Sequence, residues 1–203
     1  MGCNNSKKPK QVQKQPELKI REEKKFDQEE KVYEIKICLL GDVYVGKTSI
    51  ASRFCKNSFS DIYRNTIGGA YQTQTILLDN NVKIKLHVWD TTGDEKFKSV
   101  TNLYYRDAQV AILTYDVTKQ ETFDNLQYWI NVLSEKVDKE NMLLILAGNK
   151  CDIDKKEVTT SKAKEFAAQH NMEFFETSAK SGVGIKELFR TIANKEYELL
   201  TKN

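Results

Sequence analysis

A glycine-rich segment, GDVYVGKT, runs from Gly41 to Thr48 and holds the residue types that bind phosphate. It fits the pattern G-x-x-x-x-G-K-[ST] and lies between an apolar segment and a segment with helical spacing. Glycines let the backbone fold closely, so N–H groups and the helix N-terminus converge on phosphate oxygens. Lys47 would add positive charge, and the Thr48 hydroxyl is a hard donor of the kind that Mg²⁺ prefers. A coincidental glycine turn is the alternative, and the position between strand and helix argues against it.

Two later tetrapeptides indicate which base accompanies the phosphates. NKCD, from Asn149 to Asp152, follows an apolar segment. The Asp152 carboxylate can accept from two adjacent donors of guanine, whereas adenine would leave it unpaired. Asn149 can tie this loop to the phosphate loop. TSAK, from Thr177 to Lys180, follows the last apolar segment, and the Ala179 N–H could meet the guanine carbonyl oxygen. Each tetrapeptide alone could be a surface turn, but their order along the chain favours a guanine nucleotide site.

The elements that must position these loops follow from periodicity. Short apolar segments alternate with segments of helical spacing, which predicts an α/β fold with a mostly parallel six-stranded sheet and helices on both faces. A turn at residues 79–81 joins two strands into a hairpin, which gives the sheet one antiparallel strand. The expected strands are residues 32–40, 70–78, 82–89, 108–117, 141–150 and 172–178, and the expected helices are residues 47–57, 122–137, 160–170 and 184–200.

Composition sets further bounds. The chain has 203 residues, 39% hydrophobic and 30% charged, which is enough for one α/β domain with a core. The net charge of +3 is too small to argue for nucleic acid, so we expect no nucleic-acid partner. Cysteines are scattered without pairing or metal spacing, which fits a reduced, intracellular compartment; they are Cys3, Cys38, Cys55 and Cys151. No apolar stretch approaches a membrane span, and no signal-peptide core is found near Met1.

Residues 1–31 differ from residues 32–203. They contain both prolines and many Lys, Gln and Glu residues, with few apolar groups. Such a segment cannot bury enough surface to offset its ordering entropy, so we expect a flexible tether, in which residues 22–31 could be transiently helical. Residues 32–203 are expected to form the nucleotide-binding domain, as a monomer.

These motifs, in this order, resemble a Ras-superfamily small GTPase and, within it, the Rab family. The resemblance covers about residues 33–200 and rests on GDVYVGKT, TIG, WDTTGDE, NKCD and ETSAK. WDTTGDEKF followed by YYRDA points to Rab proteins, and TIGGAYQTQT and AGNKCD are most similar to the early-endosomal subgroup. The resemblance implies the P-loop NTPase fold called the G domain.

The resemblance also implies roles for individual residues. Thr66 would bind Mg²⁺ and the γ-phosphate, Asp90 would hold Mg²⁺, and Phe59 would pack against the guanine ring. The Gly93 N–H would meet the γ-phosphate, and with Lys47 and Asp94 it would form the catalytic set. The metal set is Thr48, Thr66 and Asp90. The GTP-binding set is Gly41, Val43, Tyr44, Val45, Gly46, Lys47, Thr48, Ser49, Phe59, Thr66, Gly93, Asn149, Lys150, Asp152, Ser178, Ala179 and Lys180.

Three aromatic residues, Tyr71, Trp89 and Tyr104, match the triad with which Rab proteins meet effectors. Exposed aromatics of this kind are typical interface anchors. The alternative is that they are half-buried sheet residues. Loss of the γ-phosphate would free both switch loops, so an order–disorder change would report the nucleotide state. The family further implies an exchange factor and a GTPase-activating protein as partners.

Asp94 departs from the family, which has a glutamine here that orients the attacking water. A carboxylate can accept from that water but cannot donate to the γ-phosphate, and it adds like-charge repulsion. Val43 and Tyr44 are larger than expected, and Thr92 replaces the usual alanine. The binding residues therefore match while the hydrolytic ones do not, which predicts slow intrinsic hydrolysis. Asp94 could instead point to solvent, and some activating proteins supply a glutamine in trans.

The N-terminus predicts a membrane anchor. Rab proteins normally end in prenylated cysteines, whereas this chain ends ELLTKN and begins MGCNNSKK. Met-Gly-x-x-x-Ser is an N-myristoylation signal on Gly2, and Cys3 is a candidate palmitoylation site. A single myristoyl chain anchors only marginally, and the basic run Lys7, Lys8, Lys10 and Lys14 suits anionic headgroups. This arrangement resembles the plant-type, N-terminally acylated branch of endosomal Rabs. The alternative is an accidental Gly2 in a solvated tail.

Three classes of function remain. The favoured one is a GTP-hydrolysing switch for endosomal vesicle traffic on the cytoplasmic face of endosomal or other internal membranes, or of the plasma membrane. The second is a GTP-bound membrane scaffold with little turnover. The third, an ATP-using phosphotransferase, would need an acceptor site and a lid, and NKCD argues against it.

Overall fold

The structure, a computed structural model, describes residues 1, 31–62, 66, 69–92, 104–136 and 142–202. Within these residues a six-stranded sheet has the order β2-β3-β1-β4-β5-β6. Its strands are β1 (Val32–Leu40), β2 (Gly69–Leu77), β3 (Lys83–Thr91), β4 (Val110–Asp116), β5 (Leu143–Asn149) and β6 (Glu173–Glu176). The helices are α1 (Lys47–Lys56), α3 (Gln120–Asp124), α4 (Leu126–Lys136), α5 (Thr160–Gln169) and α6 (Ile185–Lys202).

The sheet is mostly parallel, as predicted. β1 pairs in parallel with β3 and β4, and β5 pairs in parallel with β4 and β6. β2 is antiparallel to β3 over its whole length. The predicted hairpin turn is present, since the Leu78 N–H donates to the Val82 carbonyl at 2.9 Å and Asn81 takes a left-handed φ of 60°. The predicted α/β fold is therefore confirmed.

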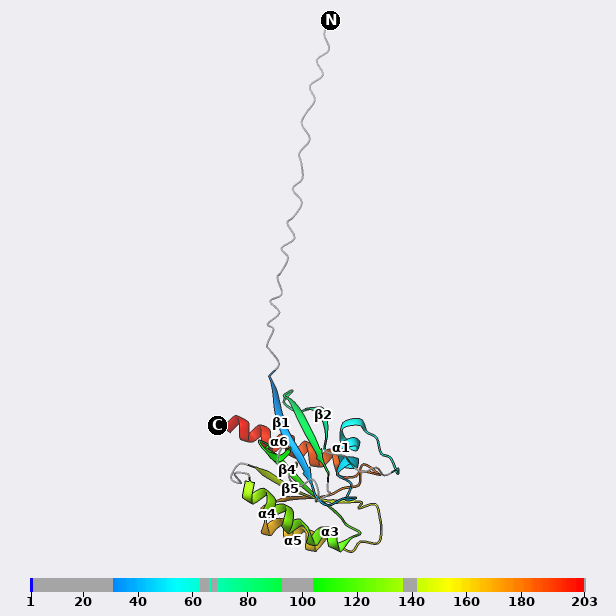
Figure 1. The fold of residues 1–203 in the computed structure, drawn as a ribbon. Helices are drawn as coiled ribbons and strands as arrows, with labels where there is room; N and C mark the ends of the chain where they lie inside the picture. The colour runs from blue at the N-terminus through cyan, green and yellow to red at the C-terminus, as the bar shows by residue number, and fades with distance from the viewer. Residues whose placement is uncertain (2–30, 63–65, 67–68, 93–103, 137–141, 203) are drawn as a thin grey trace.

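Alternate residues of the central strands point to opposite faces and form two separate cores, because side chains alternate across a strand. Ile35, Ile37 and Leu39 of β1 belong to the core beneath α1 and α6. Cys38 and Leu40 belong to the core beneath α3, α4 and α5. Figure 1 shows α1 and α6 on one side of the sheet and α3, α4 and α5 on the other. Every residue of β4 is buried, as expected for a strand covered on both faces.

The helix predicted over residues 122–137 is wrong in detail, because the structure has two helices there. α3 ends at Asp124 and α4 begins at Leu126. In the first turn of α4 the Tyr128 N–H donates to the Asn125 carbonyl at 3.1 Å, a tighter i to i+3 bond than an α-helix makes. The Asn125 side-chain amide also donates to Asp42 Oδ2 at 2.8 Å, so the junction is held against the phosphate loop. Periodicity alone could not reveal this contact.

Three of the four cysteines lie in the part of the chain that the structure describes. Cys38 is buried in β1, Cys55 lies in α1, and both are free, as is Cys151. Residues 2–30, which include Gly2, Cys3 and the lysines of the basic run, lie outside the described residues. Gly93 and Asp94 also lie outside them. Within the described ranges, no helix combines the length and the apolar character needed to cross a bilayer.

Candidate nucleotide-binding site

Three loops meet at one edge of the sheet because the strands before them are parallel. The phosphate loop follows β1, Asn149 ends β5 and the segment from Thr177 to Lys180 follows β6. The carboxyl ends of parallel strands face the same way, and ligands of such sheets bind along that edge. The sheet topology therefore brings together motifs that lie about a hundred residues apart.

Two glycines of the phosphate loop are required by their surroundings. Gly41 has a φ of 138°, and a Cβ there would stand 2.1 Å from the Thr114 carbonyl oxygen. Gly46 has a φ of 99°, and a Cβ there would stand 2.3 Å from Asn149 Nδ2. Tyr44 also takes a left-handed φ of 67°, a conformation that costs a non-glycine residue about 1–2 kcal/mol. The loop is thus wound tightly around the position expected for phosphate.

Lys47 is almost completely buried at the start of α1. Its Nζ donates to the Gly41 carbonyl at 2.8 Å and to the Asp42 carbonyl at 2.7 Å. Burial lowers the pKa of the Lys47 ammonium to about 8, against the opposing influence of Asp90 and Asp42. The ammonium therefore lies across the mouth of the phosphate loop, held by backbone carbonyls that bind it weakly compared with a phosphate oxygen.

Asp90, Thr48 and Thr66 form the candidate magnesium site. Asp90 is fully buried, and neither carboxylate oxygen has a hydrogen-bond partner that the described residues supply. Burial raises the pKa of Asp90 to about 6, while the nearby Thr48 hydroxyl, the Lys47 ammonium and the Thr66 hydroxyl act in the opposite direction. The Thr48 and Thr66 hydroxyl oxygens lie 2.7 Å apart. A buried carboxylate without partners beside two hydroxyls fits a hard cation.

The described residues contain no group of three or more His, Cys, Asp or Glu side chains that could hold a metal by itself. A magnesium ion here would therefore depend on the threonine hydroxyls, Asp90 and ligands brought by the nucleotide.

Asn149 joins the phosphate loop to the candidate base site. Its Nδ2 donates to the Val45 carbonyl at 2.9 Å, so the tie predicted from sequence is present. Its Oδ1 accepts from the Ala179 N–H at 3.2 Å and from the Thr177 hydroxyl at 3.4 Å. One buried side chain thereby fixes three loops relative to one another. The Ala179 N–H, expected to meet the guanine oxygen, faces Asn149 in this structure.

Asp152 and Lys150 are each oriented by a neighbouring side chain. The Ser178 hydroxyl donates to Asp152 Oδ1 at 2.5 Å, which leaves Oδ2 and a second lone pair of Oδ1 to accept from a ligand. Lys150 Nζ pairs with the buried Asp116 Oδ2 at 2.5 Å. The fully buried Ser178 therefore contributes to the site by orienting Asp152 rather than by lining the cavity.

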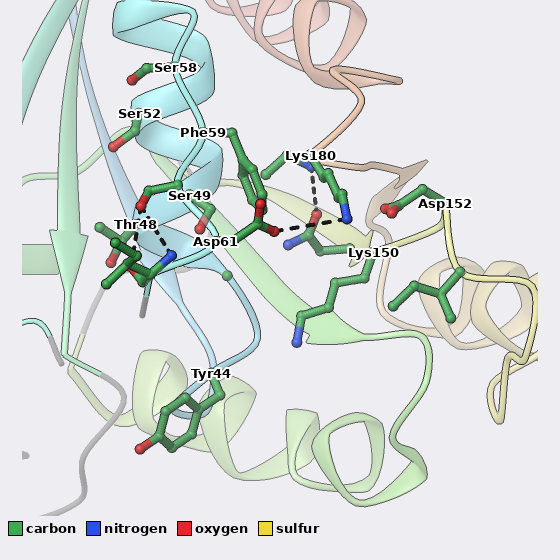
Figure 2. Close-up of a pocket in the computed structure, with 16 residues that line it drawn as sticks. Tyr44, Thr48, Ser49, Ser52, Ser58, Phe59, Asp61, Lys150, Asp152 and Lys180 are labelled. Carbon is green, nitrogen blue, oxygen red and sulfur yellow. Dashed lines mark hydrogen bonds and ion pairs between the residues drawn. The ribbon is translucent and has the colours of Figure 1, made fainter. Parts of the chain in front are cut away.

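These loops surround a cavity of about 650 Å³, within the usual size range of small-molecule sites. Figure 2 shows Thr48 and Ser49 on one side of it and Lys150, Asp152 and Lys180 on the other, with Tyr44 apart from both groups. The sequence-predicted residues that line it are Tyr44, Gly46, Thr48, Ser49, Phe59, Asn149, Lys150, Asp152, Ala179 and Lys180. Other predicted residues, Gly41, Val43, Val45, Lys47, Thr66 and Ser178, do not line it.

Six lining residues were missed from the sequence: Ser52, Ser58, Ser60, Asp61, Ile62 and Ile153. Ser52 lies one helical turn after Thr48, so helical spacing could have indicated it. Ile153 directly follows Asp152. The other four surround Phe59 in a segment without periodicity, so no local pattern distinguishes them. Asp61 pairs with Lys180 at 3.9 Å across the cavity, as the dashed line in Figure 2 shows.

The three predicted effector residues form one aromatic surface. The ring centroids of Tyr71 and Trp89 lie 4.9 Å apart, and those of Trp89 and Tyr104 lie 5.8 Å apart. Tyr71 is 49% exposed in β2, and Trp89 and Tyr104 are partly buried, so the alternative of half-buried sheet residues stays open. The sequence did not predict His87, whose Nδ1 lies 2.5 Å from the Tyr71 hydroxyl and whose Nε2 lies 3.3 Å from Glu34 Oε2.

Comparison with known proteins agrees with this geometry. A family model described as the Ras family matches residues 36–198. The Ras-related protein Rab11A of Lotus japonicus is 41% identical over 171 residues, 84% of this chain and 75% of that protein. The GTP-binding protein ypt5 of Schizosaccharomyces pombe is 43% identical over 162 residues, 79% of this chain and 76% of that protein. The human Ras-related protein Rab-22A is 42% identical over 163 residues, 80% of this chain and 83% of that protein.

Proposed function

The chain belongs to the Ras family as a small GTPase of the Rab type, and on that premise we propose that it is a membrane-anchored GTP/GDP switch for endosomal vesicle traffic. As a member of this family it is a GTPase, which converts GTP and water to GDP and phosphate. Its identity as a switch on endosomal membranes, its anchor and its turnover rate are the proposed parts.

The observation that carries the nucleotide assignment is the position of Asn149. Its side-chain N–H donates to the phosphate loop, and its side-chain oxygen accepts from the Ala179 N–H. One buried side chain therefore holds together the two loops that would bind opposite ends of one ligand. The 650 Å³ cavity beside it carries Asp152 and Lys180 at one end and Thr48 at the other. A guanine base at the Asp152 end would place its phosphates toward the N-terminus of α1.

Each residue of the phosphate end has a distinct task. Lys47 would exchange its two carbonyl partners for phosphate oxygens, which are stronger acceptors. Thr48, Thr66 and the unpartnered Asp90 carboxylate fit Mg²⁺ and would hold it. When bound, Mg²⁺ neutralises charge on the phosphates. We propose that loss of the γ-phosphate releases Thr66 and Gly93, and that this change reports the nucleotide state.

The aromatic surface of Tyr71, Trp89 and Tyr104 supports an effector site. Tyr71 lies on β2, Trp89 lies on β3 and Tyr104 precedes β4 in the chain. Trp89 directly precedes Asp90. A change at the magnesium site is therefore one residue away from the surface that a partner would read. Effectors, an exchange factor and a GTPase-activating protein are the partners we propose.

We further propose that turnover is slow, because Asp94 is an acid where a water-orienting glutamine is expected. Val43, within the phosphate loop, is 39% exposed and would crowd the γ-phosphate. The acid at residue 94 also favours the second candidate, a GTP-bound scaffold that binds effectors with little turnover. The two differ in the hydrolysis rate with an activating protein present, which only a switch would raise strongly.

The anchor proposal rests on Gly2, Cys3 and the basic run that follows them. A myristoyl group on Gly2 and a palmitoyl group on Cys3 would together hold the protein on a membrane, since one chain alone binds marginally. Residues 1–31 would form the tether and residues 32–203 the G domain.

The nucleotide assignment is tested by Asp152→Asn. An amide at residue 152 cannot accept from both guanine donors, so GDP affinity should fall about 100-fold or more in equilibrium titration. Affinity for xanthosine diphosphate should rise, because its second carbonyl can accept from the new amide. Asp154→Asn, two residues away in the chain, is the control and should bind GDP like the wild type. Equal GDP affinity in wild type and Asp152→Asn would refute the assignment.

A further inference from the structure

Arg53, in the last turn of α1, binds backbone groups of the base-recognition loop with its guanidinium. Its Nε donates to the Ala179 carbonyl at 2.7 Å, and its Nη2 donates to the Lys180 carbonyl at 2.8 Å. Its Nη1 donates to the Asn57 carbonyl at 3.1 Å and to Asn57 Oδ1 at 3.3 Å. The planar fork of arginine suits such paired acceptors, and no other side chain could supply four donors in this geometry.

The groups that Arg53 holds belong to separate walls of the cavity. Ala179 and Lys180 line the base end, and Asn57 directly precedes the lining residues Ser58 and Phe59. Arg53 itself belongs to α1, which begins with Lys47 and the phosphate loop. A single side chain thereby connects the phosphate end of the cavity, the base loop and the segment that carries Phe59.

Packing of α1 against the sheet does not need this arginine. Ile50 and Ala51 are fully buried in the core, and Phe54 stacks on Phe189 of α6 with ring centroids 3.7 Å apart. Asp152 is also held independently, by the Ser178 hydroxyl, and Ser178 is fixed within its own turn by the bond from its N–H to the Val183 carbonyl at 3.0 Å. Arg53 holds the Ala179 and Lys180 carbonyls, while Asn149 Oδ1 accepts from the Ala179 N–H, so these two side chains together fix the position of the Ala179–Lys180 backbone.

We propose that Arg53 is a positioning residue for guanine recognition, which holds the Ala179 N–H where it can meet the guanine carbonyl oxygen and thereby slows nucleotide release. This assignment rests on the proposed nucleotide site. It predicts that loss of Arg53 weakens the contact to the guanine oxygen and leaves the contact between Asp152 and the guanine amino group intact.

The test measures the affinity and the release rate of three nucleotides, GDP, 6-thioguanosine diphosphate and inosine diphosphate. The proteins are full-length wild type, Arg53→Met and Arg53→Lys. The first analogue replaces the guanine oxygen by a weak sulfur acceptor, and the second lacks the amino group that Asp152 would bind. Arg53→Met should release fluorescent GDP about tenfold faster, and its preference for GDP over the thio analogue should shrink by a similar factor. Its preference for GDP over inosine diphosphate should stay as in wild type.

Arg53→Lys should release GDP at a rate between those of the wild type and Arg53→Met, since one ammonium can keep part of the hydrogen bonds. Arg190→Met is the matched control, because Arg190 pairs with Asp79 on the hairpin turn and is not among the described residues that line the cavity. Ratios between nucleotides are unaffected by any fraction of unfolded protein. If Arg53→Met lost affinity equally for all three nucleotides, or released GDP as slowly as the wild type, the assignment would be overturned. The nucleotide site would stay in place. Failure of the wild type to bind GDP would overturn both.

Discussion

At the scale of single residues, the proposed slow turnover depends on Asp94. A glutamine can accept from the attacking water and donate to the γ-phosphate, whereas a carboxylate can only accept, and it repels the phosphate. Asp94→Gln should therefore raise the single-turnover rate of GTP hydrolysis about tenfold or more. The measurement is phosphate release from preloaded protein without an activating protein.

Asp94→Asn separates the two effects of the side chain, because it removes the charge but keeps the shorter reach. If charge repulsion dominates, Asp94→Asn should show most of the increase in hydrolysis rate that Asp94→Gln shows. If reach dominates, only Asp94→Gln should hydrolyse GTP faster than the wild type. Identical hydrolysis rates in wild type and Asp94→Gln would mean that the side chain takes no part, as expected if it points to solvent.

At the scale of elements, helix α6 carries a buried acid. Glu196 is 4% exposed, and its Oε1 has no hydrogen-bond partner within the parts of the chain that the structure describes. Burial raises the pKa of Glu196 to about 7, from an ordinary value of 4.5. The folded protein therefore binds a proton that the unfolded chain releases in the interval between these values. The contribution of Glu196 to the free energy of unfolding should be highest below pH 4.5. It should be lost as the pH rises through the folded pKa of about 7.

Glu196→Gln should remove this dependence. Since one pKa unit corresponds to about 1.4 kcal/mol, the variant should gain on the order of 2–3 kcal/mol over wild type at about pH 8 and little at about pH 4. Urea denaturation of the GDP-loaded protein across this range measures the effect. Glu198→Gln on the same helix is the control, because the Glu198 side chain is 64% exposed. A wild-type stability that rises steadily from pH 5 to about pH 7, equally in Glu196→Gln, would contradict this role.

The elements of the sheet followed closely from the sequence, while the helix over residues 120–136 did not. Strand segments are short apolar runs between turn residues, so their length and place are local properties. The break at Asn125 depends on the acceptor Asp42, which lies 83 residues earlier in the chain. A window of periodicity does not contain that partner.

At the scale of the whole molecule, the proposed anchor at Gly2 would place the G domain on a membrane. Myristoylation requires the glycine, so Gly2→Ala should move the protein from the membrane to the soluble fraction when cells are fractionated. Cys3→Ser should release it partly, because a single myristoyl chain binds with an association constant of only about 10⁴ M⁻¹. Asn4→Ala keeps both acylation sites and should behave as wild type. Gly2→Ala protein that stays fully on membranes would refute the anchor.

The sequence by itself indicated the sheet, its covering helices apart from the break at Asn125, and a candidate guanine site. GDVYVGKT and NKCD are contiguous, and each acts through the backbone conformation that its own residues favour. Only the tertiary structure decided which atoms meet. The Asn149 amide reaches the Val45 carbonyl across 104 residues, and Arg53 reaches the Ala179 carbonyl across 126. Such pairs depend on strand order and on distances of a few tenths of an ångström, which composition, spacing and periodicity do not encode.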